Sequence, residues 1–332
     1  EPDAITQEVG QIIQEHFSDH PGALNLGNLP ATSADAAAVW RWALEYALPQ
    51  FGPYEDAMSK AHRSLFHTQL APLLNLHRVL ASTVIKDAEH AELPMNCKEG
   101  FIRQILGWRE FVRHVHTATD GFRTLDGVAT ASTPDAGAAP SVLGAAHPLP
   151  AAWWDAPSGL ACLDTVVAEV WEHGWTHHIP RLMVLSNLAT LLDISPRELT
   201  DWFWVAFVDA FDWVVEPNVL SMGTFGTGPV MTTKPYVSGA NYLNKMGDYC
   251  GSCAFHPKKT CPVTPLYWAF LARHQEALST NQRMSLALGG LKRRSPERRQ
   301  QDARTLEIVR GAMDAGDVLT PERLQAELSR SE

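Results

Sequence analysis

Apolar side chains recur at intervals of three and four residues along most of the chain, which is the spacing of one face of a helix. Strand-like alternation bounded by turn residues is scarce. The segment that begins at Ser195 opens with Ser-Pro-Arg-Glu, a capping pattern with proline at the first helical position. Ser33 or Asp35 is the candidate N-cap of the first long helix. The pattern predicts a mainly α protein, with helices at 35–48, 98–116, 159–174, 179–193, 195–215 and 264–278.

Two segments break this regular pattern. Residues 117–152 are rich in Ala, Thr, Pro and Gly without helical periodicity, which is typical of a long loop or an insertion. Residues 289–304 form the one concentrated basic segment, and we interpret it either as a solvated helical face or as a contact with phosphates. The expected organisation is an N-terminal helical linker at 1–50, a catalytic helical domain at 51–290 and a basic, then helical, tail at 291–332.

The bulk composition is that of a globular protein. Hydrophobic residues make up 45% and charged residues 19% of the chain, which excludes wholesale disorder. No apolar run approaches the roughly 20 residues that span a bilayer, and the N-terminus lacks the profile of a secretory signal. The net charge of −10 disfavours a non-specific nucleic-acid binder. Five cysteines are too few for a disulfide framework, so a reducing, cytoplasmic location is expected.

Three of the five cysteines lie together in the stretch GDYCGSCAFHPKKTCP. Cys250-x-x-Cys253 followed by Cys261 has the spacing of metal ligands, and a redox dithiol is the competing interpretation. Zinc is the default metal for such a site, whereas a cysteine followed by proline favours an iron–sulfur cluster. The fourth ligand has to be Cys97 or Cys162, and the spacing does not choose between them.

Five further blocks of sequence are FIRQILGWREFVRHVH, HHIPRLMVLSNLATLL, WFWVAFVDAFDWVVEPN, KPYVSGANYLNKM and CPVTPLYWAFLARH. Together and in this order they resemble the iron–sulfur bacterial photolyase and cryptochrome family, which includes prokaryotic (6-4) photolyases. The resemblance covers about residues 51–290 and implies a helical FAD-binding domain. Family members normally begin with an α/β antenna-binding domain, of which residues 1–50 match only the following linker. A second chain that supplies this domain is therefore one candidate partner.

The resemblance also answers the question of the fourth ligand. The family's cluster cysteines lie in the patterns G-L-x-C-L-D, Y-C-x-x-C and C-P-x-T, which GLACLD, DYCGSC and CPVT match. The resemblance therefore implies a [4Fe-4S] cluster held by Cys162, Cys250, Cys253 and Cys261. Cys97 in MNCKEG matches no ligand position, and we expect it to be an ordinary thiol.

A set of FAD-binding residues follows from the same resemblance. LFHTQLA falls where the family's H-S-x-L-S cradles the FAD phosphates, with Ala71 in place of a serine. Arg181 and Asp209 look like the ion pair beside the isoalloxazine ring, where a fixed cation stabilises the reduced flavin. Val215 stands where a hydrogen-bonding Asn or Glu usually faces flavin N5, and Glu216 is the candidate replacement. The implied FAD-binding residues are Tyr54, His67, Thr68, Leu70, Arg109, Arg181, Asp209 and Val215.

A histidine pair and two tyrosines match the family's lesion pocket. His177 and His178 fall at positions where a histidine acts as general acid in (6-4) repair. Without the flanking matches, two adjacent histidines at a helix start are more often cap or core groups. Tyr236 and Tyr242 fall near this pocket, and Trp108 is expected to form one of its walls.

Two tryptophans match the family's route for electrons to the flavin, and these are Trp202 and Trp154. Phe203 stands where the family commonly has tyrosine, and phenylalanine is a poor carrier of an electron hole. The path then either jumps directly or uses Trp204 or Trp153. The alternative interpretation is that these indoles only pack the core.

Three classes of function are compatible with these observations. The first is a light-driven (6-4) photolyase or a cryptochrome-type photoreceptor, with UV-damaged DNA or a signalling protein as partner. The second is a flavin and iron–sulfur redox enzyme for a small molecule, which the acidic charge, Val215 and the 117–152 insertion favour. The third is a regulatory subunit that has lost catalysis. We favour the photolyase, on the strength of the histidine pair and the two tyrosines.

Overall fold

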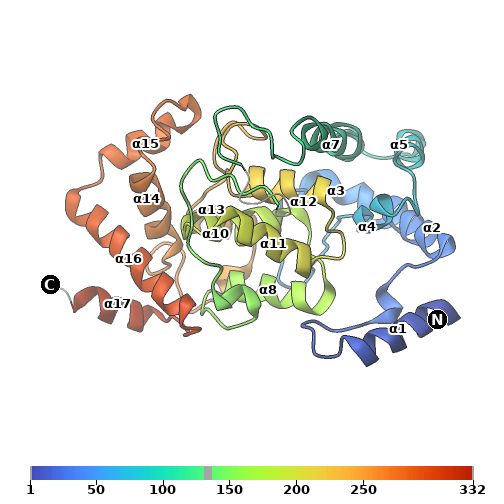
Figure 1. The fold of residues 1–332 in the computed structure, drawn as a ribbon, viewed down its shortest axis with the longest axis horizontal. Coiled ribbons are helices and arrows are strands. Elements are labelled where there is room, and N and C mark those ends of the chain that lie inside the picture. The colour runs from blue at the N-terminus through green and yellow to red at the C-terminus, as the bar shows by residue number, and fades with distance from the viewer. Residues whose placement is uncertain (1, 131–136, 331–332) are drawn as a thin grey trace.

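The computed structural model describes residues 2–130 and 137–330, and helices dominate it (Figure 1). The prediction of a mainly α protein is therefore confirmed. Within the described residues, the only β pairing outside the helices is one isolated parallel bridge between His147 and Ile194. None of the described helices combines the length and the apolar character that crossing a membrane requires.

The α-helices are α1 (Ala4–His16), α2 (Ser33–Trp42), α3 (Leu48–Tyr54), α4 (Ala71–Asn75), α5 (Ala81–His90), α6 (Met95–Ile102), α7 (Arg109–Ala118), α8 (Ala161–His173), α9 (His178–Pro180), α10 (Asn187–Leu191), α11 (Pro196–Ala206), α12 (Asp212–Val215), α13 (Ala240–Met246), α14 (Val263–Arg273), α15 (Ser285–Lys292), α16 (Pro296–Asp314) and α17 (Pro321–Ser329). The 3₁₀ turns are η1 (Leu26–Asn28), η4 (Ala151–Trp154), η7 (Tyr249–Gly251) and η8 (Gln282–Met284). The π-helical turns are η2 (Ala43–Ala47), η3 (Arg103–Trp108), η5 (Arg181–Ser186) and η6 (Glu216–Gly223).

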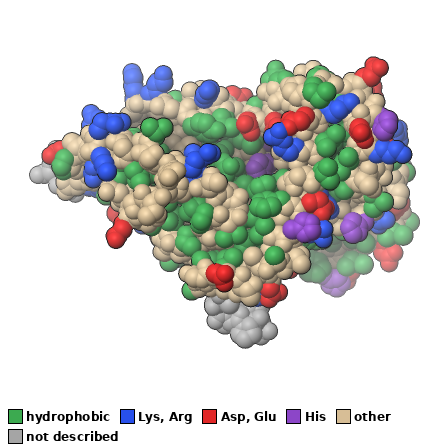
Figure 2. Space-filling model, turned by 90° about the horizontal axis from the view of Figure 1, so that it is seen from above, with side chains coloured by type: hydrophobic (Ala, Val, Ile, Leu, Met, Phe, Trp, Pro, Cys, Tyr) green, Lys and Arg blue, Asp and Glu red, His purple; other side chains and the backbone are tan. Residues whose placement is uncertain are grey.

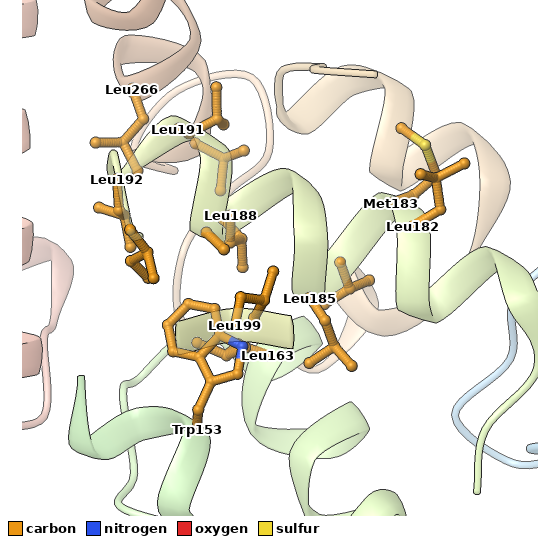
Figure 3. Packing of buried hydrophobic residues seen from close by; sticks show 14 of the residues in the cluster. Trp153, Leu163, Leu182, Met183, Leu185, Leu188, Leu191, Leu192, Leu199 and Leu266 are labelled. Atoms are coloured by element: carbon orange, nitrogen blue, oxygen red, sulfur yellow. The ribbon is translucent and has the colours of Figure 1, made fainter. Parts of the chain in front are cut away.

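The buried apolar side chains form two clusters. The larger one is built mainly from α8, α10, α11 and α14, and Figure 3 shows the indole of Trp153 beside Leu163, Leu188 and Leu199 within it. The smaller one joins α2, α3, α5 and α6, and its centre contains Trp40. The indole N–H of Trp40 donates a hydrogen bond of 2.8 Å to a carboxylate on α5, which fixes the ring. The two clusters meet around the cavity described below.

The helix caps follow the predicted chemistry, with one shift. Thr32, rather than Ser33 or Asp35, is the N-cap of α2. Its hydroxyl accepts from the backbone N–H of Asp35 at 3.1 Å, and the Asp35 carboxylate accepts from the N–H of Thr32 at 3.0 Å. This reciprocal pair is a capping box, which satisfies two donors that the helix start leaves unpaired. Ser195 caps α11 as predicted and accepts from the N–H of Glu198.

The single helix predicted at 195–215 is two helices, α11 and α12, separated by an irregular link. The N–H of Val208 in this link donates to the carbonyl of Gly174 at 2.9 Å, so it is not available to the helical ladder. The next residue, Asp209, forms an ion pair with Arg181. Contacts with a distant segment therefore override a sequence whose local pattern favours a continuous helix.

The segment 117–152 is largely irregular after α7, as its composition predicts, although residues 131–136 lie outside the described part of the chain. The N–H of Val142 donates to the carbonyl of the buried Gly226 at 3.0 Å. The described part of the segment thus covers a buried loop that follows η6. None of its described residues lines the large cavity.

One carboxylate, that of Asp193, joins three helices. It lies in the turn after α10 with a φ of 53°, a left-handed conformation that Asp and Asn tolerate better than most residues. It accepts from Arg273 at 2.7 Å, from His274 at 3.0 Å and from Arg310 at 2.9 Å. Burial alone would raise the pKa of Asp193, but the hydrogen bond from His274 and the charge of Arg273 outweigh it and lower this pKa to about 2.

Replacing Asp193→Asn should lower the free energy of unfolding by about 2 kcal/mol at pH 7, because it removes the charge and keeps the backbone conformation. The folded-state pKa lies below the unfolded one, so this contribution is present above about pH 4 and disappears as the pH falls towards 2. Chemical denaturation at a series of pH values measures the difference from wild type. Asp314→Asn, at an exposed pair with His147, is the matched control and should cost less than about 1 kcal/mol. An equal loss of unfolding free energy in the two variants would contradict the role of Asp193 as the carboxylate that joins the three helices.

Candidate functional site

A cavity of 1070 Å³ lies between the two apolar clusters. This volume is at the upper end of the range of about 300–1,000 Å³ that small-molecule sites occupy, so a large ligand fits. Most of its lining surface is apolar, and a few charged and hydrogen-bonding groups point into it. Figure 2 shows a hollow on the upper face of the molecule, with apolar side chains around it and a histidine at its floor.

Three π-helical turns form walls of this cavity, and they are η3, η5 and η6. A π-helical turn is wider than an α-helical turn and occurs frequently at functional sites. Proline explains two of the three, because it lacks the N–H that an α-helix needs and interrupts the regular ladder. Pro180 directly precedes η5, and Pro217 is the second residue of η6. The sequence therefore widens the helices where the cavity forms.

The strongest polar contact of the cavity is a two-pronged ion pair. The Nη1 and Nη2 atoms of Arg181 each donate to one carboxylate oxygen of Asp209 at 2.9 Å. The Nε of Arg181 donates to the carbonyl of Thr176 at 2.7 Å, and its guanidinium lies 4.2 Å from the ring centre of Phe207. Asp209 is buried, so the pair is held rigidly in one orientation at the cavity wall.

A second cation, Arg109, lines the cavity at the start of α7. Its guanidinium lies 4.9 Å from the ring centre of Trp213, and its nearest carboxylate is that of Glu110 at 3.6 Å. Burial lowers the pKa of Arg109, although the group remains charged at neutral pH. A cation so weakly compensated is suited to an anionic part of a ligand.

Three histidines meet at one end of the cavity. The rings of His67 and His177 stack with their centres 4.1 Å apart, and the ring of His67 is hydrogen-bonded to the carbonyl of Glu55. Burial, assisted by the charges of nearby groups, lowers the pKa of His67 to about 4 and that of His177 to about 2. His178 alone of the three is exposed, and the surface it exposes lines the cavity. The surrounding protein and Arg181 lower its pKa too, so all three rings are neutral at pH 7.

The cavity brings together nearly all of the residues that the sequence assigned to FAD and to the lesion pocket. Those that line it are His67, Thr68, Leu70, Trp108, Arg109, His177, His178, Arg181, Asp209, Val215, Tyr236 and Tyr242. Tyr54 is not among them, since its side chain is 45% exposed outside the cavity and packs against Phe66, with the ring centres 5.1 Å apart. The lining residues that sequence reasoning missed include Glu55, Trp175, Trp213, Asn218 and Trp268.

The neighbourhood of Val215 differs from the expectation. Glu216, the candidate replacement for the missing hydrogen-bonding group, does not line the cavity and instead accepts from Arg197 at 2.9 Å. Asn218, three residues after Val215, does line the cavity. Its side-chain oxygen accepts from the indole N–H of Trp108 at 2.9 Å, and its nitrogen donates to a backbone carbonyl at 2.7 Å. The second N–H of this amide has no partner among the described residues and is thus available to a ligand.

An unbroken series of aromatic rings runs from the cavity to the surface. Phe203 lines the cavity, and its ring centre is 5.3 Å from that of the buried Trp202. Trp171 lies 6.1 Å from Trp202 and 5.7 Å from Trp154, which is 48% exposed. Trp171 therefore bridges the two predicted tryptophans, and the sequence analysis missed it. The expected intermediates Trp153 and Trp204 make no ring contact with this series among the described residues.

The four cysteines assigned to a cluster, Cys162, Cys250, Cys253 and Cys261, line a second, small cavity with apolar walls. Burial and then the neighbouring thiols raise the pKa of Cys162, and burial raises the pKa of Cys261 to about 12. Within the described ranges, no three His, Cys, Asp or Glu side chains form a group that could hold a metal ion. Cys97 is buried elsewhere, as an ordinary thiol would be.

Comparisons with known proteins agree with this geometry. Residues 101–248 match the model of the family described as the FAD binding domain of DNA photolyase. A (6-4) photolyase of Agrobacterium fabrum is 34% identical over 293 residues, which cover 86% of this chain and 55% of that protein. An uncharacterised protein of Acanthamoeba polyphaga mimivirus is 39% identical over 66 residues, or 20% of this chain and 54% of that protein.

A solved structure, that of a bacterial class III photolyase from Agrobacterium tumefaciens, has the same fold. The TM-score is 0.53 at 17% sequence identity, over 90% of this chain and 58% of the other. The chain thus spans little more than half the length of each of these three proteins. On this combined evidence residues 101–248 form an FAD-binding domain of the photolyase type, and the chain is similar to a (6-4) photolyase over most of its own length.

Proposed function

We propose that this protein is a light-driven DNA photolyase that acts on (6-4) photoproducts and holds FAD and a [4Fe-4S] cluster. The observation that carries the proposal is the shared cavity, in which the Arg181–Asp209 pair lies beside the exposed ring of His178. The chemistry that reduced FAD would supply in this cavity is light-driven electron transfer to the lesion. The relative that is named a (6-4) photolyase supports the choice of lesion.

Different residues of this chain would bind different parts of FAD. His67 and Thr68 lie side by side in the lining, where a backbone N–H and a hydroxyl suit phosphate oxygens. Arg109 adds a cation whose one ion pair among the described residues is with Glu110 at 3.6 Å. The Arg181–Asp209 pair presents a fixed dipole to the ring system, and the free N–H of Asn218 offers one hydrogen bond. Val215 contributes only an apolar contact at its position in the wall.

His178 would hold and deliver the proton that repair of a (6-4) photoproduct requires. Its ring is neutral at pH 7 in the protein alone, because the surrounding protein and the nearby Arg181 disfavour a second positive charge. The phosphates of FAD and DNA bring negative charge, which favours the protonated ring. Tyr236 and Tyr242, which are exposed at the rim of the same cavity, are placed to contact an extruded nucleotide.

The small cysteine cavity fits a polynuclear cluster better than a single zinc ion. Zinc needs four ligands at about 2.3 Å from one centre, and this set does not gather as a single-ion site. Four thiols that surround a common space with apolar walls suit an iron–sulfur cluster, which is larger than one ion. A positively charged metal centre would counter the rise in the pKa of Cys162 that burial, and then the neighbouring thiols, cause here.

A second candidate is a flavin-dependent redox enzyme that acts on a small molecule. The net charge of −10 favours it, because repulsion from DNA phosphates grows with the negative charge of the protein. The largely apolar cavity of 1070 Å³ would accept such a substrate as well. The repair assay described next separates the two candidates.

Changing His178→Ala should reduce light-dependent repair of a (6-4) photoproduct by roughly 100-fold or more, because a general acid contributes about that much. Repair by the wild type should become faster as the pH falls from 8 to 6, since the lowered pKa leaves little of the ring protonated, and the variant should lose this dependence. The measurement is lesion loss under blue light and in the dark, with reduced protein of known FAD content. His114→Ala, at an exposed histidine outside the cavity, is the control. A fully loaded wild type that neither binds nor repairs the lesion would favour the small-molecule enzyme.

Changing Cys253→Ala should remove the iron and the inorganic sulfide of the cluster, because three thiolates hold it poorly. Iron and sulfide analysis of the anaerobically purified protein measures this loss. Cys97→Ala should retain both, since the Cys97 thiol lies outside the cysteine cavity and contacts the backbone of Gly52 and Pro49. Stoichiometric zinc with no sulfide in the wild type would contradict the assignment.

Changing Trp171→Phe should slow the light-driven reduction of bound FAD by an external donor by roughly tenfold, a barrier increase of about 1.4 kcal/mol. The replacement keeps an aromatic ring but removes the readily oxidised indole between Trp202 and Trp154. Transient absorption or steady-state bleaching of the flavin measures the rate. Trp204→Phe, outside the series, should leave it unchanged. Repair by chemically reduced Trp171→Phe protein should persist, and its loss would point to a structural effect instead.

A further inference from the structure

The exposed face of α15 has an unusual composition. Leu286 is 90% exposed, and it is followed on the same side of the helix by Gly289 and Arg293, three and seven residues later. Arg283 precedes the helix and is also exposed, as is Lys292 at its last turn. A Cβ built at Gly289 would meet nothing within 4 Å, so the backbone there is open to close approach. We call these five residues the α15 face.

The cations of the α15 face differ from those around them. Arg283, Lys292 and Arg293 make no ion pair and no side-chain hydrogen bond with any described residue. The adjacent Arg294 instead pairs with the buried carboxylate of Asp302. The basic segment at 289–304 therefore contains two kinds of cation. Some stabilise the fold through internal pairs, and others are free to bind an external partner.

A further arginine of this segment also serves the fold. Arg299 donates to the carbonyl of Arg294 at 3.1 Å and to that of Leu291 at 2.6 Å, which ties the start of α16 to the end of α15. Its donors are thus directed towards the backbone of the protein. The α15 face and the exposed Arg298 on α16 are the parts of this region whose cations have no side-chain partner among the described residues.

The helix α15 is anchored to the wall of the large cavity close to Leu286, because Gly290 follows Leu286 by four residues and lies on nearly the same side of the helix. A Cβ at Gly290 would lie 3.0 Å from the ring of Trp268, and Trp268 lines that cavity. Just before α15, the side chain of Asn281 donates to the carbonyl of Thr233 at 2.8 Å, next to the cavity-lining Lys234. The α15 face therefore belongs to the rim of the site, and Figure 2 shows Lys and Arg side chains over this end of the molecule.

We propose that the α15 face is a contact surface for the sugar–phosphate backbone of duplex DNA. The eight residues of α15 span about 12 Å, which matches the length of roughly three phosphates along one strand. The three unpaired cations would bind phosphates, and Gly289 would let the strand approach the helix closely. Leu286 would make the apolar contact with a deoxyribose or an unstacked base.

Charge and shape favour DNA over an acidic protein as the occupant. A protein interface buries a broad, largely apolar core, whereas the α15 face offers one leucine among three cations. The inference rests on the proposed function, because duplex DNA reaches this rim only if one of its nucleotides enters the cavity. The inference adds the surface that would hold the duplex, since the cavity residues themselves contact only the nucleotide.

The test is the salt dependence of DNA binding in the dark by the FAD-loaded protein. The probe is a fluorescein-labelled duplex with one (6-4) photoproduct, and its binding is followed by anisotropy over a series of KCl concentrations. The double variant Arg283→Gln/Arg293→Gln should weaken binding and make the slope of log K against log salt shallower by about 2, since each lost phosphate contact contributes about 0.9. Leu286→Ala should weaken binding without changing the slope, because an apolar contact releases no counterions.

The control is Arg41→Gln, which removes an exposed arginine on α2, at the other end of the molecule from α15 (Figure 1). It should leave both affinity and slope unchanged. A wild-type slope in the double variant would overturn the α15 assignment, and light-dependent repair by the same protein would leave the photolyase proposal intact. An equal loss of binding to polyglutamate would overturn DNA as the specific occupant. If the double variant lowers the salt slope but the wild type does not repair the lesion under light, the α15 face would still be a DNA-binding surface. The proposed photolyase reaction would then be contradicted.

Discussion

The ion pair between Arg181 and Asp209 is the contact on which the architecture of the site depends. Asp209 is buried, and both of its oxygens accept from the same guanidinium, so losing either partner would leave an unpaired charge at a cost of about 3–5 kcal/mol. Asp209 can reach Arg181 only if the chain leaves the helical path after α11, and Arg181 opens the π-helical turn η5. The break between α11 and α12 and the π-helical turn η5 therefore both accompany this ion pair. The cavity lies beside them and is lined by both partners of the pair.

The same pair contributes to the charge state of the cavity. Desolvation by the surrounding protein lowers the pKa of His177 and of His178, and the fixed cation Arg181 beside them adds to this, so both rings are neutral at pH 7. An anionic ligand would counter this effect, since negative charge near an imidazole favours its protonated form. Binding of a phosphate-bearing ligand and uptake of a proton are then thermodynamically linked. A histidine in such a cavity takes up the proton that a general acid needs only when the anionic ligand binds. It is neutral, and cannot donate that proton, before then.

Local sequence predicted the helices and the start of α11 at Ser195, because apolar periodicity and capping are properties of neighbouring residues. The resemblance added several of the residues that line the cavity, since it compares whole blocks. The break at Asp209 was missed because a distant arginine decides it, and Trp171 was missed because nothing local distinguishes a bridging indole from a core indole. Glu216 is the predicted replacement because it follows Val215 directly, but it pairs with Arg197 and does not line the cavity, whereas Asn218 does. In each case tertiary contacts outweigh what adjacent residues favour.

The acidic net charge does not decide whether the site can bind a polyanion. At physiological ionic strength, charges more than about 8 Å apart in solvent are largely screened, so a phosphate responds mainly to the groups that surround it. Many cations of this chain are paired internally, as Arg294 is with Asp302 and Arg310 with Asp193, and they contribute little to the external field. Arg283 and Arg293, on the α15 face, have no ion pair among the residues that the structure describes. The distribution of unpaired cations, and not their excess over carboxylates, is therefore what makes a local phosphate-binding surface compatible with a net charge of −10.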